Sequence, residues 1–194
     1  MTSTDPPVLQ LRTPRLLLRQ WRDSDDAPFA ALNADPAVME HFPRLLTADE
    51  SRAQADRYAA QLQVDGYGIW AVEVLETDQL AGFVGLARPQ WEAAFTPCVE
   101  IGWRLARSAW GHGYATEGAG AVLRLAFTRF ALPEVVSFTA VANRRSRAVM
   151  ERLGMHRDPA EDFDHPRIPE GEPTRRHVLY RLAQPEWTAA TASR

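Results

Sequence analysis

The sequence predicts a single α+β domain in which a group of strands precedes an alternation of strand, helix, strand, helix and strand. Alternating apolar and polar residues indicate strands at 68–75, 80–88 and 97–105, and the first two form a hairpin. A helical pattern follows at 113–130. Its apolar positions repeat at i, i+3, i+4, i+7, i+8 and i+11 and form one continuous face, which consists of Ala119, Val122, Leu123, Ala126, Phe127 and Phe130.

The N-terminal third contains extended segments followed by two helices. Residues 8–21 form two extended pieces, and the acidic residues at 23–26 start a short helix. Thr47 and Glu50 have the spacing of a capping box, so we expect a second helix to begin there and to run to about Val64.

Shorter elements complete the C-terminal part. A β-branched strand is expected at 135–141, followed by a short helix at 144–153. Asn143 is a good N-terminal cap for this helix, and Gly154 ends it. A polar, proline-rich loop then leads to a last strand at 177–182.

Length, charge and cysteine content narrow the class of protein. The 194 residues suffice for one core, which we place at 8–183, with flexible termini at 1–7 and 184–194. A net charge of -3 argues against a general nucleic-acid binder, because phosphate contacts need a basic excess. The single cysteine, Cys98, cannot form an internal disulfide, which fits a reducing compartment.

The hydropathy pattern argues against a membrane protein. No apolar run approaches the roughly 20 residues that span a bilayer. The first residues also lack the apolar stretch of a secretion signal. We therefore expect a cytoplasmic protein with neither a membrane nor a nucleic acid as its partner.

The segment WGHGYAT, from Trp110 to Thr116, lies between a strand and the long helix and is the most informative part of the chain. Its glycines, Gly111 and Gly113, let the backbone approach a ligand closely and adopt a positive φ. The helix that follows begins with unpaired N–H groups and a partial positive charge, so the segment can bind a pyrophosphate. Taken alone, the same pattern could be no more than a turn.

Two common phosphate-binding motifs are excluded. The glycine spacing differs from that of the dinucleotide fingerprint, and no acidic residue closes a following strand where a ribose would bind. A Walker loop is excluded because the chain contains no Gly-Lys-Ser/Thr sequence.

Residues 100–122 (EIGWRLARSAWGHGYATEGAGAV) resemble the coenzyme A motif of the GCN5-related N-acetyltransferase (GNAT) superfamily. In that motif Gln or Arg is followed, after two residues, by Gly, any residue, and Gly or Ala. Gly113 and Ala115 match, whereas Trp110 stands where Gln or Arg is usual. The tryptophan version is typical of the branch that includes the ribosomal-protein alanine N-acetyltransferases. Because the cradle works through backbone amides, Trp110 is compatible with binding.

A second patch supports the resemblance. Residues 143–146 (NRRS) and 149–155 (VMERLGM) are similar to the branch's Asn-x-x-Ser and Leu-Gly-Phe/Met element. The two motifs stand in the family's order, and the resemblance covers residues 9–182. It implies the GNAT fold, a single domain with a central mixed, mostly antiparallel, splayed β-sheet flanked by helices, either monomeric or homodimeric.

The resemblance also implies a reaction, in which acetyl passes from acetyl-CoA directly to a primary amine of a small molecule or peptide. Cys98 is then a packing residue, because no acyl-enzyme intermediate is expected. The backbone at 103–105 is expected to hold the pantetheine arm. The cofactor-binding residues implied are Trp103, Arg104, Leu105, Trp110, Gly111, His112, Gly113, Tyr114, Ala115, Thr116, Asn143 and Ser146.

Glu100 and Ser146 are the candidate catalytic residues. Glu100 lies on the motif strand, where desolvation would raise its pKa toward a value useful for a general base, acting directly or through water. It could instead pair with an arginine or face solvent. Ser146 is the candidate acid or thiolate-orienting group, because Met150 replaces the family's usual tyrosine. Ser146 could also bond only to backbone, and Tyr114 is a second candidate proton donor.

Other polar residues leave alternatives open. The arginines at 144, 145 and 147 could contact coenzyme phosphates or form a solvated helix face. The acids and histidine at 162–166 lack a second histidine at ligand spacing, so we expect a polar loop and no metal. His41 and His177 could line the acceptor site.

Two functions compete with acetyl transfer. One is a coenzyme A-binding regulatory module without turnover, and the other is a plain interaction domain in which Gly-His-Gly is a turn. A fold resemblance alone does not identify the acceptor.

Overall fold

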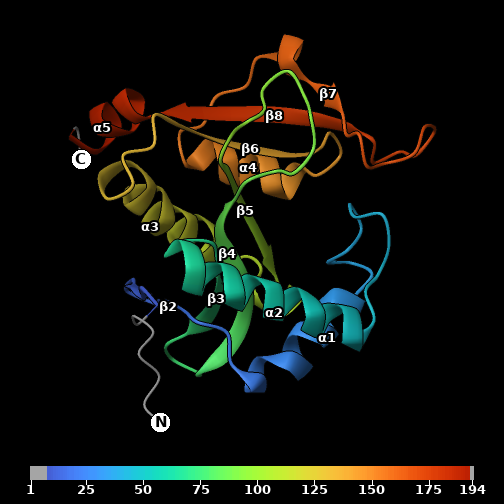
Figure 1. The fold of residues 1–194 in the computed structure, drawn as a ribbon, viewed down its shortest axis with the longest axis vertical. Helices are drawn as coiled ribbons and strands as arrows, with labels where there is room; N and C mark the ends of the chain where they lie inside the picture. Colours follow the sequence, from blue (N-terminus) through green and yellow to red (C-terminus); the bar gives the residue numbers. More distant parts are fainter. Residues whose placement is uncertain (1–7, 193–194) are drawn as a thin grey trace.

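A computed structural model describes residues 8–192, whose strands form one open sheet in the order β1-β2-β3-β4-β5-β6-β8-β7 (Figure 1). In this sheet β5 and β6 run parallel, and the other neighbouring pairs are antiparallel. The expected α+β class with a mixed, mostly antiparallel sheet is confirmed. The strands are β1 (Leu11–Arg12), β2 (Leu16–Arg19), β3 (Ile69–Val74), β4 (Gln79–Ala87), β5 (Glu100–Leu105), β6 (Glu134–Ala140), β7 (Phe163–Asp164) and β8 (Arg176–Ala183).

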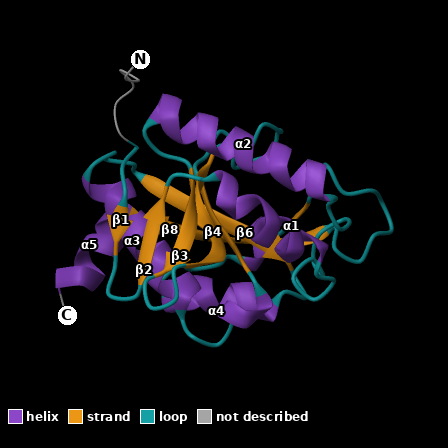
Figure 2. Ribbon diagram, turned by 90° about the horizontal axis from the view of Figure 1, so that it is seen from below, coloured by secondary structure: helices purple, strands orange, loops and turns teal. Residues whose placement is uncertain are grey.

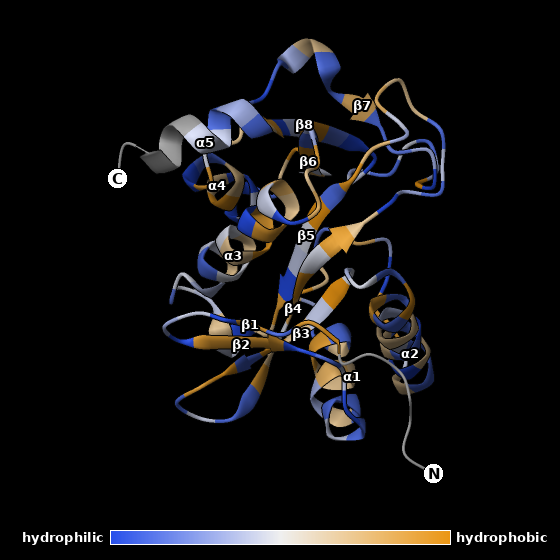
Figure 3. Ribbon diagram, turned by 60° about the vertical axis from the view of Figure 1, so that its left-hand side comes forward, coloured by the Kyte–Doolittle hydropathy of each residue, from blue (hydrophilic) through white to orange (hydrophobic). Residues whose placement is uncertain are grey.

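Helices cover both faces of the sheet, with α1 and α2 on one side and α3 and α4 on the other (Figures 2 and 3). Among the helices described, none combines the length and apolar character needed to cross a membrane. The α-helices are α1 (Asp26–Ala34), α2 (Ala48–Asp65), α3 (Tyr114–Thr128), α4 (Arg144–Arg152) and α5 (Gln184–Ala192), and short 3-10 turns lie at η1 (Asp23–Asp25), η2 (Arg107–Ala109) and η3 (Pro159–Glu161).

Local sequence signals account for the ends of these helices. The Thr47 side chain accepts a hydrogen bond from the Glu50 N–H, and the Glu50 carboxylate accepts one from the Thr47 N–H, which is the predicted capping box. Gly66 ends α2 in the left-handed conformation. Asn143 caps α4 through the Ser146 N–H, also as predicted.

The predicted apolar face of α3 packs on the sheet. Ala119, Val122, Leu123 and Ala126 are fully buried there. Gly118 also belongs to this contact, because a Cβ at that position would lie 3.3 Å from Val84 Cγ2 on β4. The α3 helix, which lies beside β4 and β5 in Figure 1, is thereby fixed against the strands.

The sheet splays where β5 leaves β6. Strand β5 pairs with β4 from Glu100 to Leu105, but with β6 only through Glu100 and Val136. Beyond Glu100 the two parallel strands diverge, and the edge of β5 that faces β6 has no strand partner in the described chain. This divergence positions the site described below.

Two C-terminal expectations were wrong. The segment expected to be a flexible tail forms α5, because Trp187 packs on Phe127 at 5.9 Å between ring centroids and the Gln184 side chain donates to the Phe127 carbonyl. Residues 1–7, 193 and 194 of the expected termini lie outside the described residues. The loop expected at 162–166 contains the short strand β7, which pairs with β8 through Phe163 and His177.

Candidate active site

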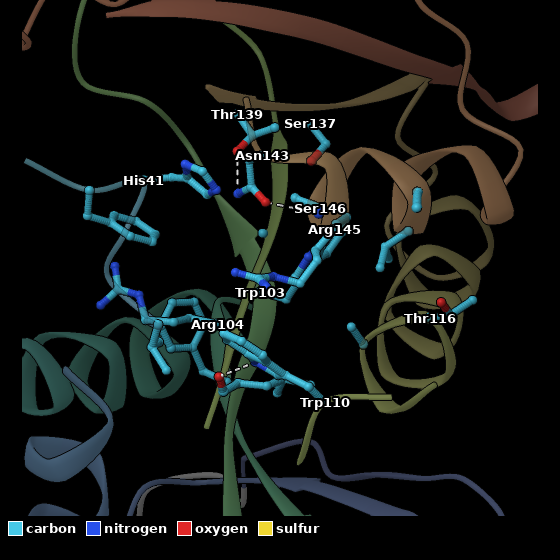
Figure 4. Close-up of a pocket in the computed structure, with 18 of the residues that line it drawn as sticks. His41, Trp103, Arg104, Trp110, Thr116, Ser137, Thr139, Asn143, Arg145 and Ser146 are labelled. Carbon is cyan, nitrogen blue, oxygen red and sulfur yellow. Dashed lines mark hydrogen bonds between the residues drawn. The ribbon is translucent and has the colours of Figure 1, made fainter. Parts of the chain in front are cut away.

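A cavity of about 1340 Å³ opens where β5 and β6 diverge (Figure 4). Its walls come from four parts of the fold: the segment between α1 and α2, the start of α3, α4, and the strands β5 and β6. In Figure 4, His41 and Arg104 lie on one side of this space, and Asn143, Ser146 and Thr116 lie on the other. Every residue predicted to bind the cofactor or to act in catalysis lines this one cavity, although they are spread from Glu100 to Ser146 in the sequence.

The loop before α3 has the geometry expected of an anion cradle. Gly111 and Gly113 both have φ of +79°, a conformation that residues with a Cβ rarely adopt. Gly113 is the N-cap of α3, so the N–H groups of the first helical turn begin at Tyr114 and face the cavity end of the helix. The helix dipole adds partial positive charge at the same place.

Trp110 has a structural role at this loop that the sequence did not indicate. Its indole N–H donates a 2.9 Å hydrogen bond to the carbonyl of Leu105, the last residue of β5. The guanidinium of Arg145 stacks over the same ring at 4.2 Å. The tryptophan therefore connects the loop to both the motif strand and α4. These contacts are made by the indole ring, although Gln or Arg is usual at this position.

The free edge of β5 presents backbone groups to the cavity. The bond from the Ala106 N–H to the Ala81 carbonyl fixes which β5 groups point toward β4. Because backbone groups alternate along a strand, those of Trp103 and Leu105 point the other way, into the gap beside β6. The Leu105 carbonyl is taken by Trp110, and Trp103 keeps both of its groups on the free edge.

Arg104 departs from the prediction for this strand. The same alternation turns its backbone groups toward β4, and its side chain donates to Asn33 Oδ1 on α1 at 2.7 Å. Arg104 therefore lines the cavity from the α1–α2 side of the sheet, away from the free edge of β5.

Glu100 lies at the point where β5 and β6 separate. Desolvation raises its pKa to about 8. No hydrogen bond or ion pair to its carboxyl group is found among residues 8–192, so the arginine partner considered above is not seen. Tyr58 of α2 lies close enough for the Glu100 charge to raise the tyrosine pKa, although burial contributes more to that shift.

Helix α4 closes the opposite wall. The Asn143 amide accepts from the Ser146 N–H at 3.2 Å and donates to Thr139 Oγ1 at 2.9 Å, so its orientation is fixed by β6 as well as by the helix. Ser146 lines the cavity, and the structure gives its hydroxyl no partner among the described residues. Met150, at the position of the family's usual tyrosine, is 1% exposed and packs in the core, away from the cavity.

The arginines of α4 differ in their surroundings. Arg144 and Arg145 line the cavity and are exposed, and Arg145 also pairs with Glu40 at 3.1 Å across the opening. Arg147 points elsewhere and donates to the Val141 carbonyl. Arg144 and Arg145 can therefore contact a phosphate bound in the cavity, whereas Arg147 does not line the cavity.

Sequence reasoning missed a contact that anchors the cradle. Arg15, on the turn before β2, donates to the His112 carbonyl at 2.9 Å and forms a 2.6 Å ion pair with Glu117 in the first turn of α3. Thr13 donates to the same carboxylate at 2.6 Å. About a hundred residues separate the partners along the chain, so no local pattern could have indicated the pairing.

The far end of the cavity is aromatic. His165 and His177 line it, with ring centroids 5.0 Å apart, and Phe138 packs beside both. Burial lowers the pKa of His165 to about 4, so this ring is neutral near pH 7. The described residues contain no group of three His, Cys, Asp or Glu side chains that could hold a metal ion.

Comparisons with known proteins agree with this geometry. A profile of the acetyltransferase (GNAT) domain matches residues 15–156. The FsC-acetyl coenzyme A-N(2)-transacetylase of Aspergillus fumigatus is 33% identical over 166 residues, which cover 80% of this chain and 68% of that protein.

Solved structures show the same fold. A GNAT-family acetyltransferase from Bacillus anthracis, 22% identical, superposes with a TM-score of 0.75 over 91% of this chain and 99% of its own. A structure described as a ribosomal-protein-serine acetyltransferase, from Vibrio cholerae, has a TM-score of 0.73 at 18% identity over 91% and 98% of the two chains. The profile match spans most of the chain, and this protein therefore belongs to the GNAT acetyltransferase family and is an acyltransferase.

Proposed function

We propose that this enzyme transfers acetyl from acetyl-CoA directly to a primary amine, with Glu100 as the general base. The observation that carries the proposal is the meeting, in one cavity, of a backbone anion cradle and an unpaired, desolvated carboxyl group. The Aspergillus fumigatus relative, whose name includes both acetyl coenzyme A and an N(2) acceptor, supports the same donor and the same kind of acceptor.

The donor occupies the side of the cavity formed by β5, α3 and α4. The N–H groups at the start of α3 bind its pyrophosphate, and the exposed arginines Arg144 and Arg145 add positive charge nearby. The free backbone N–H and C=O groups of Trp103, on the unpaired edge of β5, hydrogen-bond the pantetheine arm. Asn143, fixed by its hydrogen bond to Thr139, lies on the opposite wall of the cavity. Backbone recognition explains why Trp110 is tolerated in the motif.

The chemistry requires one proton to leave the amine and one to reach the sulfur. As the amine nitrogen bonds to the thioester carbonyl carbon and the C–S bond breaks, Glu100 accepts the amine proton directly or through water. Ser146, whose hydroxyl is uncommitted, hydrogen-bonds the departing thiolate, which is protonated through it or from solvent. Tyr114 is held by the His112 ring and by Arg15, which makes it the weaker candidate for this role.

Thermal unfolding in the presence of acetyl-CoA tests the donor assignment. Ligand at about 100 times its Kd stabilises the folded state by about 2.7 kcal/mol, which is a rise of several degrees in Tm for a chain of this size. Gly113→Val forces a branched side chain into a left-handed backbone, so it should weaken acetyl-CoA about tenfold or more by displacing charge-assisted hydrogen bonds.

The matched control is Gly171→Val. Gly171 has φ of +86° and open space around it, outside the cavity, so the control carries similar backbone strain. Gly171→Val should lower Tm without ligand and retain the full rise in Tm when acetyl-CoA is added. An unchanged Tm of the unmodified protein at millimolar acetyl-CoA would refute the donor assignment and favour a plain interaction domain.

Direct transfer predicts that Cys98 is dispensable. Burial and the neighbouring Glu100 charge raise the pKa of this thiol to about 11, so well under about 0.1% of it is thiolate near neutral pH. Cys98→Ala should therefore keep kcat/KM within about twofold. Mass spectrometry of the quenched enzyme supplies the decisive readout, because an acetyl adduct that disappears in Cys98→Ala would establish an acyl-enzyme route.

A further inference from the structure

Arg104 is a half-buried cation, and no acidic partner for it is found in the described part of the chain. Burial lowers the pKa of Arg104, which remains a cation at neutral pH. Its Nη1 donates to the neutral Asn33 amide at 2.7 Å and lies 3.5 Å from Gln54 Oε1. Its Nε is buried and has no hydrogen-bond partner, and no carboxylate pairs with the guanidinium among residues 8–192. Such an arrangement is unfavourable unless something else supplies the negative charge.

The comparison with Arg19 shows what this fold does with a buried guanidinium when its role is structural. Arg19 is 2% exposed and binds two carboxylates, Asp25 at 2.7 Å and Glu73 at 2.7 Å. Arg104 has amides where Arg19 has acids, and unlike Arg19 it lines the cavity. The missing anion is therefore expected to arrive through the cavity.

The surroundings of Arg104 keep the guanidinium in place without neutralising it. Its guanidinium carbon lies over two aromatic rings, 4.1 Å from the ring centroid of Phe42 and 5.3 Å from that of Phe83. Aromatic contacts of this kind take up none of its N–H donors, and the hydrogen bonds described above use only Nη1, so donors remain at the edge of the group, which is the part that binds a carboxylate. Stacking alone offsets less than the cost of burying an unpaired charge.

Arg104 shares a strand face with the proposed base. Residues 100, 102 and 104 of β5 point to the same side, and Tyr58 of α2 interacts electrostatically with both Glu100 and Arg104. The two charged positions are four residues apart, or about 13 Å between their Cα atoms in an extended strand. An acceptor that reacts beside Glu100 can therefore reach Arg104 with another part of its structure.

We infer that the amine acceptor also carries a carboxylate and that Arg104 binds this carboxylate. The inference rests on the proposed function, and it specifies the acceptor as a small amine with an acidic group several bonds from the reacting nitrogen. The net charge of -3 by itself would favour a purely cationic acceptor such as a diamine. The positive charge of Arg104 inside the cavity is closer to the acceptor and therefore has the larger effect. We do not assign the donor phosphates as this anion, because the Arg104 side chain bonds to Asn33 of α1, whereas the proposed phosphate site is at the start of α3.

Matched pairs of amines test the inference on the unmodified enzyme. Each pair consists of an amino acid and its primary amide, for example 6-aminohexanoate with 6-aminohexanamide, β-alanine with β-alaninamide, and lysine with lysinamide. Thiol release should give a kcat/KM at least about tenfold higher for the acid of the preferred pair, since one charge-assisted pair contributes about 1.5–3 kcal/mol. Phosphoethanolamine, included as a separate arm, should be a poorer acceptor than that acid.

Variants then assign the preference to the side chain. Arg104→Gln should lower kcat/KM for the acid about 10- to 100-fold more than kcat/KM for the amide, whereas Arg104→Lys should keep part of the preference. Arg107→Gln removes an exposed arginine just beyond the same strand, whose side chain pairs with Asp35 at 3.6 Å, and should leave the preference for the acid intact.

The outcomes separate this inference from the proposed function. Loss of the acetyl-CoA thermal shift would overturn the proposed function itself. The inference alone would be overturned if acetyl-CoA raised Tm normally but the enzyme turned over acid and amide equally. The same conclusion would follow if it preferred the amide or phosphoethanolamine, or turned over no carboxylated amine. A preference for the acid that survives Arg104→Gln would also overturn it, because another group would then hold the carboxylate.

Discussion

Replacing Glu100 by glutamine is expected to lower kcat/KM for acetyl transfer about 10²- to 10⁴-fold, the range typical of losing a general base. The substitution keeps the size of the side chain and removes its ability to accept a proton. No hydrogen bond among the described residues depends on the carboxylate, so the geometry of β5 should survive the change. Steady-state kinetics measures the loss, and Glu76→Gln, on the exposed turn before β4, is the matched control.

The pH dependence distinguishes loss of a base from general damage. Both the Glu100 carboxyl, with a pKa of about 8, and the amine acceptor must lose a proton before they react. Below about pH 8, log kcat/KM should therefore rise with a slope near two, and above it the slope should fall to about one, for the amine alone. In Glu100→Gln the slope should be about one throughout.

Stability should change in the opposite direction from activity. Because the folded-state pKa of Glu100 is raised above its usual value of 4.5, the folded chain binds this proton more tightly than the unfolded chain does. The free energy of unfolding therefore falls as the pH increases from about 4.5 to about 8, and this loss is complete above pH 8. Glu100→Gln should consequently raise Tm relative to the wild type at pH 9 and have little effect at pH 4.5.

An inactive Glu100→Gln enzyme with raised stability at high pH would agree with a carboxyl group kept desolvated for function. Activity within about threefold of the wild type, with an unchanged two-slope profile, would eliminate Glu100 as the base. A coenzyme-binding module without turnover would then be the better description, provided that acetyl-CoA still raised Tm.

The sequence was sufficient for features that depend on neighbouring residues. The apolar repeat located the buried face of α3, and the spacing of Thr47 and Glu50 located the start of α2. Gly111 and Gly113 indicated a positive-φ loop before a helix, because few other residues adopt that backbone conformation. Each of these signals acts within one or two turns of chain, which is why a single sequence contains it.

Contacts between distant segments could not be predicted in the same way. The Arg15–Glu117 pair that fixes the cradle and the neutral surroundings of Arg104 both depend on how separate elements meet in space. Glu100 was identified from its motif strand, but its lack of a partner is a property of the splayed sheet. The α5 helix was missed because its docking partner, Phe127, lies 57 or more residues earlier.

The largest expected effect on stability arises from one such distant contact, at Arg19. Its guanidinium joins Asp25, at the start of α1, to Glu73 on β3, and all three side chains are nearly inaccessible to solvent. Arg19→Met retains a long apolar side chain but leaves two buried carboxylates with less compensation. The free energy of unfolding should fall by about 3–5 kcal/mol, which corresponds to roughly 6–20 °C in Tm for a chain of this length.

Arg22→Met provides the control, because Arg22 binds the same Glu73 at 2.9 Å from a side chain that is 52% exposed. That change should cost about 0–1 kcal/mol, as expected for a largely exposed ion pair. If orphaned charge is the cause of the loss in Arg19→Met, adding Asp25→Asn and Glu73→Gln should restore much of the stability. If the triple variant is as unstable as Arg19→Met, the loss reflects hydrogen-bond geometry at the start of α1. Since α1 also carries Asn33, the partner of Arg104, acid preference should then weaken together with stability.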